Sequence, residues 1–280
     1  EYSFQIRGIL HLGSSRFPKY SHGTFESWYR RHAAEQQASF ERQVSYFHGC
    51  YVNYNNPQLG KDMIRIMNAL GYGVRLLEKE KCCGVALISN GLYSQAKRQA
   101  RTNMESIRTA VKGDGRDVIT TSSTCTFTIR DEYPHLLDLE NGDVRDHVEL
   151  ATRYIYRLIN EQGAKLRFRE DVGPLRVAYH TPCHMEKMGW AYYSIELLRM
   201  IPGVEVTVLD SQCCGIAGTY GFKKENYQTS QAVGEPLFRQ IEASGADLVA
   251  TDCETCKWQI EMSTSKRCEH PLSILASRLA

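Results

Sequence analysis

Cysteines recur in the same order in both halves of this sequence. In the second half the order is a single cysteine, a Cys-Cys-Gly triplet and a Cys-x-x-Cys motif, at Cys183, Cys213-Cys214-Gly215 and Cys253-Glu254-Thr255-Cys256. The first half contains Cys50, Cys82-Cys83-Gly84 and Cys125. A pattern repeated over this length predicts two similar structural units in tandem, because each repeat must fold as a unit of its own.

Each cysteine set follows an apolar, strand-like run, and helical stretches separate the runs. We predict strands over residues 43–50, 74–77, 117–122, 175–180, 204–209 and 246–251, and helices over 57–70, 92–111, 131–138, 145–161, 190–200 and 224–243. Roughly thirty residues between successive cysteine positions is the length of one right-handed crossover, which makes neighbouring strands parallel. The sequence therefore predicts an α/β fold with two tandem pseudo-symmetric domains, each a small parallel β-sheet flanked by helices.

In a parallel sheet all strands end at the same edge, and doubly wound folds bind their ligands there. Residues that follow successive strands therefore converge, although they lie far apart in the sequence. We expect one such edge to collect Cys183, Cys213, Cys214, Cys253 and Cys256. The equivalent edge of the first half is expected to collect Cys50, Cys82, Cys83 and Cys125.

The predicted domains are an N-terminal extension over residues 1–42, a first domain over 43–172 and a second over 173–280, with Gly173-Pro174 at the boundary. The extension is basic and aromatic between Arg7 and His32. Such a composition suits a membrane-headgroup interface or a docking surface on another subunit. The alternative is a solvated arm that packs on the first domain.

The composition argues against a nucleic-acid-binding, membrane-spanning or secreted protein and favours a metal or redox protein. Lysine plus arginine (34) nearly balance aspartate plus glutamate (32), so the chain has no long-range field that would attract nucleic acid. It has no apolar run long enough for a spanning helix and no secretory signal, so any membrane contact is expected to be peripheral. Ten cysteines in such a chain favour metal or redox chemistry over disulfides.

The cysteine pattern fits a metal cluster better than a zinc ion. Zinc takes four ligands in a tetrahedron, whereas the second half offers five cysteines, two of them adjacent. Adjacent residues point their sulfurs in different directions and so reach two different metal ions more easily than one. A multi-iron cluster supplies such separate ions. Gly84 and Gly215 then allow the backbone to approach the cluster and to take positive φ where needed.

The two halves are unequal. The second half has a complete Cys-x-x-Cys motif, whereas Cys125 is followed by Thr126-Phe127-Thr128, with threonine at the expected position of the last cysteine. We therefore expect the second half to be the better metal site. Two acidic residues of the second half, Asp252 and Glu254, are interpreted as solvated acids or helix N-terminal charges.

The motif Cys-x(29)-Cys-Cys-Gly-x(37)-Cys-x-x-Cys, from Cys183 to Cys256, resembles that of the CCG-domain family. This cysteine-rich family includes the B subunit of heterodisulfide reductase, the E subunit of succinate:quinone reductase and glycolate oxidase iron-sulfur subunits. The stretches 17–25, 46–60 and 76–84 are similar to those of one branch, the C subunits of anaerobic glycerol-3-phosphate dehydrogenases. The resemblance extends over essentially the whole chain.

That resemblance implies an iron-sulfur electron-transfer subunit that performs no chemistry on glycerol 3-phosphate itself. It would accept electrons from FAD-containing catalytic subunits and pass them to menaquinone, as a peripheral protein at the cytoplasmic face of the inner membrane. Members of this branch also carry an N-terminal ferredoxin-like region with two cysteine runs. No such runs occur here, so we expect either a truncated piece or a loss of that region.

In the B subunit of heterodisulfide reductase, each five-cysteine motif holds a noncubane 4Fe-4S cluster. The resemblance carries this role fully to the five cysteines of the second half and only in part to the four of the first. His48 and His180 lie beside the cysteines and are candidates to donate to cluster sulfides, to ligate iron or to carry the quinone proton. The alternative for each is a loop histidine with ordinary protein partners.

Two other functions stay open at this point. The chain could be an enzyme proper, a disulfide reductase in which the cluster cleaves a substrate S–S bond. It could also be a zinc-stabilised module that anchors a dehydrogenase to a membrane or a partner. Iron, zinc and sulfide contents separate the last possibility from the others.

Overall fold

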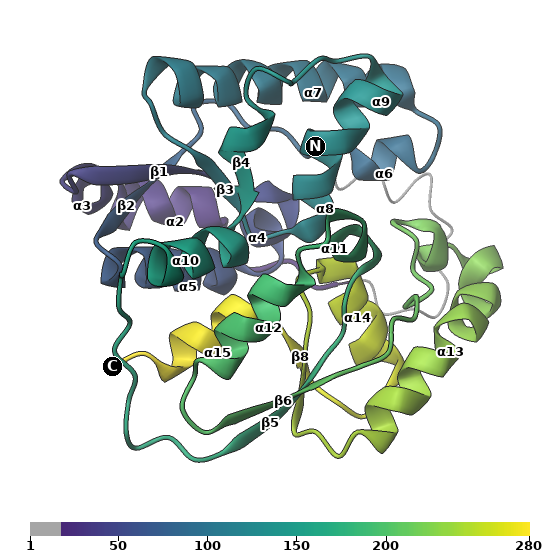
Figure 1. The fold of residues 1–280 in the computed structure, drawn as a ribbon. Coiled ribbons are helices and arrows are strands. Elements are labelled where there is room, and N and C mark those ends of the chain that lie inside the picture. Colours follow the sequence, from purple (N-terminus) through teal and green to yellow (C-terminus); the bar gives the residue numbers. More distant parts are fainter. Residues whose placement is uncertain (1–17) are drawn as a thin grey trace.

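The structure is a computed structural model and describes residues 18–280. Within these residues it contains two four-stranded sheets, one in each half, and all neighbouring strands in them are parallel (Figure 1). The first sheet has the order β2-β1-β3-β4, formed by β1 (Arg42–Phe47), β2 (Tyr72–Leu76), β3 (Val118–Thr120) and β4 (Val148–Leu150). The second has the equivalent order β6-β5-β7-β8, formed by β5 (Leu175–Tyr179), β6 (Val204–Val208), β7 (Leu248–Ala250) and β8 (Cys268–Glu269). The predicted fold class is confirmed.

Helices flank both sheets (Figure 1). Those of the first half are α2 (Phe25–His32), α3 (Ala34–Ala38), α4 (Gly49–Tyr54), α5 (Pro57–Ala69), α6 (Val85–Ile88), α7 (Tyr93–Arg108), α8 (Ser123–Phe127), α9 (Tyr133–Leu137) and α10 (Ala151–Asn160). Those of the second half are α11 (Cys183–Met188), α12 (Ala191–Arg199), α13 (Tyr227–Ala243), α14 (Glu254–Ser263) and α15 (Pro271–Arg278). Short π and 3-10 turns lie at Thr109–Gly113, Thr128–Glu132, Arg145–His147, Tyr220–Phe222 and Lys224–Asn226.

Helix α5 illustrates how local sequence sets these elements. The Asn56 side chain caps the helix by accepting a hydrogen bond from the backbone N–H of Leu59, and Pro57 occupies the first turn, where its missing N–H costs nothing. Apolar residues at helical spacing bury one face. Gly71 follows the helix with a φ of +82°, a left-handed conformation that glycine adopts without strain.

Strands β1 and β5 lie inside their sheets, and alternate residues along each of them face different hydrophobic cores. Tyr46 of β1 and Tyr179 of β5 belong to one core that both halves share. Phe47 packs instead in a core of the first half, and Ala178 in a core of the second. The two-residue period of a strand accounts for this division. Each sheet therefore has one face toward the other half and one face toward a core of its own.

The predicted helix over residues 145–161 is wrong in its first part. Residues 145–147 form a 3-10 turn, Val148–Leu150 is the edge strand β4, and only α10 is helical. All three residues of β4 are buried. Glu149 resembles a polar helix position in the sequence, but its carboxylate pairs with Arg153 and Arg157 of the following helix. A strand this short has no alternation pattern that distinguishes it from a helix.

Part of the predicted extension packs on the first sheet. Phe25 of α2 is fully buried, and the Tyr29 hydroxyl donates to the Val74 carbonyl at 2.7 Å. Gln37 of α3 accepts a hydrogen bond from the Val74 N–H at 3.0 Å. Phe25, Tyr29 and Val74 belong to the core that both halves share, so this part of the chain is packed as in the packed-arm alternative. The basic residues before position 18 lie outside the described residues, and the domain boundaries stay a prediction.

Candidate metal centre

The five cysteines of the second half lie together at the carboxyl edge of their sheet. The Sγ atoms of Cys214 and Cys256 are 3.3 Å apart. Thiol hydrogen bonds also join Cys183 to Cys213 and Cys253 to Cys256. Each of these residues is a free cysteine. The predicted convergence of distant thiols is thus found, and metal binding by them remains a prediction.

The four cysteines of the first half form an equivalent group. The Sγ atoms of Cys50 and Cys82 are 3.9 Å apart, and a thiol hydrogen bond joins Cys83 to Cys125. Cys83 and Cys125 are buried in the core on the outer face of the first sheet. Among residues 18–280, no three His, Cys, Asp or Glu side chains are arranged to hold one metal ion. The thiols therefore approach one another as adjacent pairs.

Strand registers align the two halves position by position. In the first sheet Tyr46 pairs with Ile119, and in the second sheet Tyr179 pairs with Ala250. The first cysteine of each half follows its tyrosine by four residues. The last cysteine of each half follows Ile119 or Ala250 by six residues. The two thiol groups are therefore built on equivalent backbone positions.

This alignment changes the position at which the first half lacks a cysteine, from Thr128, as the sequence analysis predicted, to Ser122. Cys125 corresponds to Cys256, so Ser122 occupies the position of Cys253. The helix starts agree, because Ser122 is the N-cap of α8 and Cys253 the N-cap of α14. Thr128, the position expected from sequence, lies beyond α8, and its hydroxyl donates within the following turn. The first half thus has Ser-x-x-Cys where the second half has Cys-x-x-Cys.

Gly84 and Gly215 end the two Cys-Cys-Gly triplets in the left-handed region, with φ of +97° and +84°. A Cβ atom on Gly84 would meet Ala96 at 3.5 Å, which is ordinary contact. A Cβ atom on Gly215 would lie 2.0 Å from the Ser230 carbonyl oxygen of α13. Gly215 is therefore required by helix packing as well as by φ. The predicted approach of these glycines to a cofactor stays a prediction.

Replacing Gly215 by alanine is expected to lower the free energy of unfolding by about 3 kcal/mol or more, because the methyl group meets backbone and the residue stays left-handed. Gly91 is the matched control, since it has a φ of +73° and no atom within 4 Å of the place that a methyl group would occupy. Gly91→Ala should cost only about 1–2 kcal/mol. Urea unfolding of the metal-free proteins measures both. Equal losses would show that contact with α13 does not constrain Gly215.

The two candidate histidines differ in their surroundings. The His48 Nδ1 lies 3.0 Å from the Gly49 carbonyl oxygen and 3.2 Å from the Glu80 carboxylate. Glu80 also accepts hydrogen bonds from the backbone N–H groups of His48 and Gly49, and so caps α4. His48 therefore has the ordinary protein partners of a structural residue. His180 is buried with no partner for either ring nitrogen among the described residues.

Neighbouring thiols determine which cysteines are ionised. Hydrogen bonds from Cys183, then from Cys214, lower the pKa of Cys213 to about 2, and the Gly215 N–H adds a bond of 3.3 Å. A hydrogen bond with Cys256 lowers the pKa of Cys253 to about 6. These contacts favour the thiolate form of both residues. Thiolates are the form that binds metals, so the arrangement of the second-half thiols favours metal binding.

Residues next to the first-half thiols contact the second-half thiol group across the interface between the halves. Helix α8 of the first half lies beside α11 of the second (Figure 1), and its N-terminal residues reach the start of α14. The Thr124 hydroxyl is 3.6 Å from Cys253 Sγ. The Ser122 hydroxyl donates to the Glu254 carboxylate at 3.0 Å. The two thiol groups are therefore neighbours, joined through the start of α8.

The expectation of a solvated acid is wrong for Asp252, whereas Glu254 lies in the first turn of α14, as the helix N-terminal alternative predicted. Asp252 is fully buried and accepts hydrogen bonds from the hydroxyls of Tyr179 at 2.7 Å and Ser194 at 2.9 Å. Burial, then the charge of Cys253, raises the pKa of Glu254 to about 8. Both residues flank Cys253 directly after a strand, and this position was the one sequence signal of a role beside the thiols. Contacts with Ser122 and Thr152 of the first half enclose this segment, and the sequence alone does not show them.

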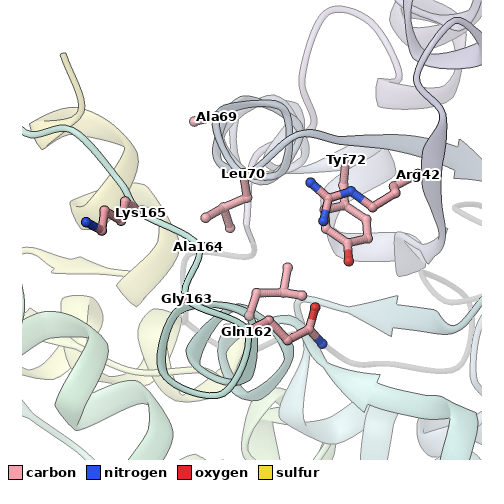
Figure 2. Close-up of a pocket in the computed structure, with 9 residues that line it drawn as sticks. Arg42, Ala69, Leu70, Tyr72, Gln162, Gly163, Ala164 and Lys165 are labelled. Carbon is pink, nitrogen blue, oxygen red and sulfur yellow. The ribbon is translucent and has the colours of Figure 1, made fainter.

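Two pockets lie away from the thiols. Figure 2 shows the first, where Arg42, Leu70 and Tyr72 of the first half face the linker segment 162–165. The second is apolar and continues along the same linker between Phe168 and helices of both halves. Neither pocket is lined by cysteine or histidine. They therefore do not extend the candidate metal centre.

In the part of the chain that the structure describes, no helix has the length and apolar character needed to cross a membrane.

A family profile described as a cysteine-rich domain (CCG) matches residues 44–130 and again 177–261. The C subunit of the anaerobic glycerol-3-phosphate dehydrogenase of Escherichia coli is 67% identical over 94% of this chain, which spans 65% of the length of that relative. Lactate utilization protein A of Bacillus licheniformis is 30% identical over 75% of this chain and 87% of its own.

A more distant relative is the D subunit of the dihydromethanophenazine:CoB–CoM heterodisulfide reductase of Methanosarcina barkeri. It is 29% identical over 76% of this chain and 52% of its own. Among solved structures, an aspartate racemase homologue from Pyrococcus horikoshii covers 85% of this chain and 96% of its own at 14% identity, with a TM-score of 0.30. A similarity at that level carries no argument about function.

Proposed function

The chain belongs to the CCG family of cysteine-rich proteins, and from this we propose that it is the iron-sulfur electron-transfer subunit of an anaerobic glycerol-3-phosphate dehydrogenase. The observation that carries the proposal is the assembly of nine cysteines from six strand ends into two equivalent thiol groups. The 67% identity to the Escherichia coli protein supports the choice of complex.

The residues present fit an iron-sulfur cluster. In the second half, Cys183, Cys213, Cys214, Cys253 and Cys256 would hold a noncubane 4Fe-4S cluster. In the first half, the ligands would be Cys50, Cys82, Cys83 and Cys125, with Ser122 at the fifth position. When bound, such a cluster supplies one-electron oxidation and reduction.

The chain's own residues support this role in two ways. Neighbouring thiols lower the pKa of Cys213 and Cys253, which favours the thiolate form that binds iron. The partly buried contacts of Ser122 and Thr124 with Glu254 and Cys253 join the two thiol groups. Two thiol groups joined in this way suit a protein that relays electrons.

In the assembled complex, the proposal also names the electron donor, the electron acceptor and the location of this chain. FAD-containing catalytic subunits would reduce this chain, and menaquinone would be the acceptor. The chain would lie at the cytoplasmic face of the inner membrane as a peripheral protein. Purifying the catalytic subunits with and without this chain tests the relay, because menaquinone reduction by glycerol 3-phosphate should require it while dye reduction should not.

Protein purified without oxygen is expected to contain iron and acid-labile sulfide in similar amounts and to show a paramagnetic signal in one redox state. Metal analysis by mass spectrometry, sulfide assay and electron paramagnetic resonance of the same sample measure this. Zinc without iron would contradict the proposal and favour the anchoring module.

A disulfide reductase is the second candidate, favoured by the similarity to a component of heterodisulfide reductase. The assay is reduction of a heterodisulfide by a reduced dye with this chain as the sole protein. Turnover at rates above those of the Cys214→Ser protein would assign it that activity. Iron and sulfide without such turnover leave the electron-transfer role as the function.

A further inference from the structure

His180 is a buried histidine whose ring has no hydrogen-bond partner in the part of the chain described here. Its side chain is 1% exposed, and both Nδ1 and Nε2 are unpaired. Its backbone is ordinary, since the N–H donates to the Ala250 carbonyl at 2.9 Å as a continuation of the sheet. Buried polar atoms in native proteins almost always have partners, so an unpaired ring indicates a group that the protein atoms do not include.

The ring of His180 faces the thiols of the second half. Tyr179 belongs to the core shared by both halves, whereas Ala178 belongs to the core that also contains Cys214, Cys253 and Cys256. Because side chains alternate along a strand, His180 points to the same side as Ala178. The ring is also close enough to Cys213 for the charge of each to affect the other.

Other buried histidines of the chain do have partners. His270 approaches the Thr121 carbonyl oxygen at 2.7 Å and accepts a hydrogen bond from the Leu272 N–H at 3.1 Å. The first half has no counterpart to the unpaired ring, because the residue that follows Tyr46 there, as His180 follows Tyr179, is Phe47. The second half therefore has a polar group at this position that the first half lacks.

We propose that the His180 imidazole donates an N–H hydrogen bond to a sulfur atom of the cluster that the second-half cysteines hold. This inference rests on the proposed function, and it makes His180 a positioning residue that tunes the centre. A neutral imidazole carries one N–H donor, and cluster sulfides and thiolates are acceptors. Hydrogen bonds to these sulfurs favour the more negative, reduced cluster.

The proposal predicts that the two halves differ in reduction potential. His180 would stabilise the reduced state of a second-half centre, whereas Phe47 has no N–H to offer at the equivalent position of the first half. This effect would add to the difference that five cysteines in one half and four in the other already make.

The test is redox titration of the full chain, followed by electron paramagnetic resonance, for His180→Phe and His180→Gln. His180→Phe copies the side chain of the first half and should lower the midpoint potential of the second-half signal. At a fixed potential near the midpoint, the ratio of reduced to oxidised centre should fall about tenfold, as expected for the loss of one hydrogen bond to a charged group. His180→Gln retains an N–H donor and should recover part of the shift.

A second readout uses the metal-free protein. There the unpaired ring has no sulfide to meet, so His180→Phe should raise the melting temperature of the apoprotein while lowering the potential of the loaded one. His147→Phe is the control, because His147 is half exposed and pairs with Asp117 at the opposite edge of the first sheet. His147→Phe should change neither the melting temperature of the apoprotein nor the midpoint potential of the loaded protein.

The outcomes separate this inference from the proposed function. If the wild-type chain binds no iron, the proposed function fails and this inference fails with it. If iron, sulfide and the paramagnetic signal are present but His180→Phe leaves the potential unchanged, the function stands and the hydrogen bond is refuted. Coupling of an exchangeable deuteron to the cluster, present in wild type and lost in His180→Phe, would establish the donor directly.

Discussion

Replacing Cys214 by serine is expected to abolish the paramagnetic signal of the second-half cluster while the protein remains folded. Cys214 is buried, and its sulfur lies 3.3 Å from that of Cys256, so it is central to the thiol group. A serine hydroxyl is far less acidic than a thiol and does not replace a soft thiolate ligand. The measurement is electron paramagnetic resonance with iron and sulfide analysis on anaerobically purified protein. Iron per chain should fall by the content of one cluster.

Cys268 provides the matched control. It is also a fully buried free cysteine, but it lies on the edge strand β8, outside the repeated pattern. Cys268→Ser should leave the signal and the iron content unchanged, at a modest cost in stability. Retention of the full signal in Cys214→Ser, or an equal loss in Cys268→Ser, would mean that the second-half thiols do not hold the centre.

Replacing Ser122 by cysteine is expected to complete the first-half site. Ser122 occupies the backbone position of Cys253 at the start of its helix, so a thiol there should approach the thiol of Cys125 as Cys253 approaches Cys256. In the Cys214→Ser background, the added ligand should produce a signal of the five-cysteine type and raise the iron content. The change removes a serine N-cap, which costs about 1 kcal/mol.

Thr128→Cys in the same background tests the alternative position. Thr128 is fully buried beyond α8, and its hydroxyl bonds within the following turn, so a thiol there should add no ligand. A five-cysteine signal from Thr128→Cys and none from Ser122→Cys would overturn the alignment of the two halves. Both variants carry one new cysteine, so a nonspecific effect of an added thiol would appear in both.

Spacing along the chain was sufficient to predict the parallel sheets and the grouping of thiols. A crossover of roughly thirty residues has a fixed hand and returns the chain to the same edge, so residues such as Cys183 and Cys256 must meet. The short edge strands were not predictable. Val148–Leu150 and Cys268–Glu269 are too short to show a period, and their strand conformation depends on pairing with β3 and β7.

The position of the missing ligand was available in the sequence but was predicted wrongly. Counting forward from Cys125 led to Thr128, whereas Cys125 follows Cys83 by 42 residues just as Cys256 follows Cys214, which makes Ser122 the equivalent of Cys253. Strand register gives the same correspondence independently, because hydrogen bonds between strands fix which residues lie side by side.

By itself, the sequence determined the duplicated α/β scaffold and the cysteines that its strand ends bring together, because backbone geometry limits how a chain can cross over. The tertiary structure alone decided which surfaces became interior. Packing of one half on the other buried Asp252 and joined Ser122 to Glu254. It also left the ring of His180 enclosed beside the thiols without a partner among the described residues. These are contacts between residues far apart in the chain, and no local pattern encodes them.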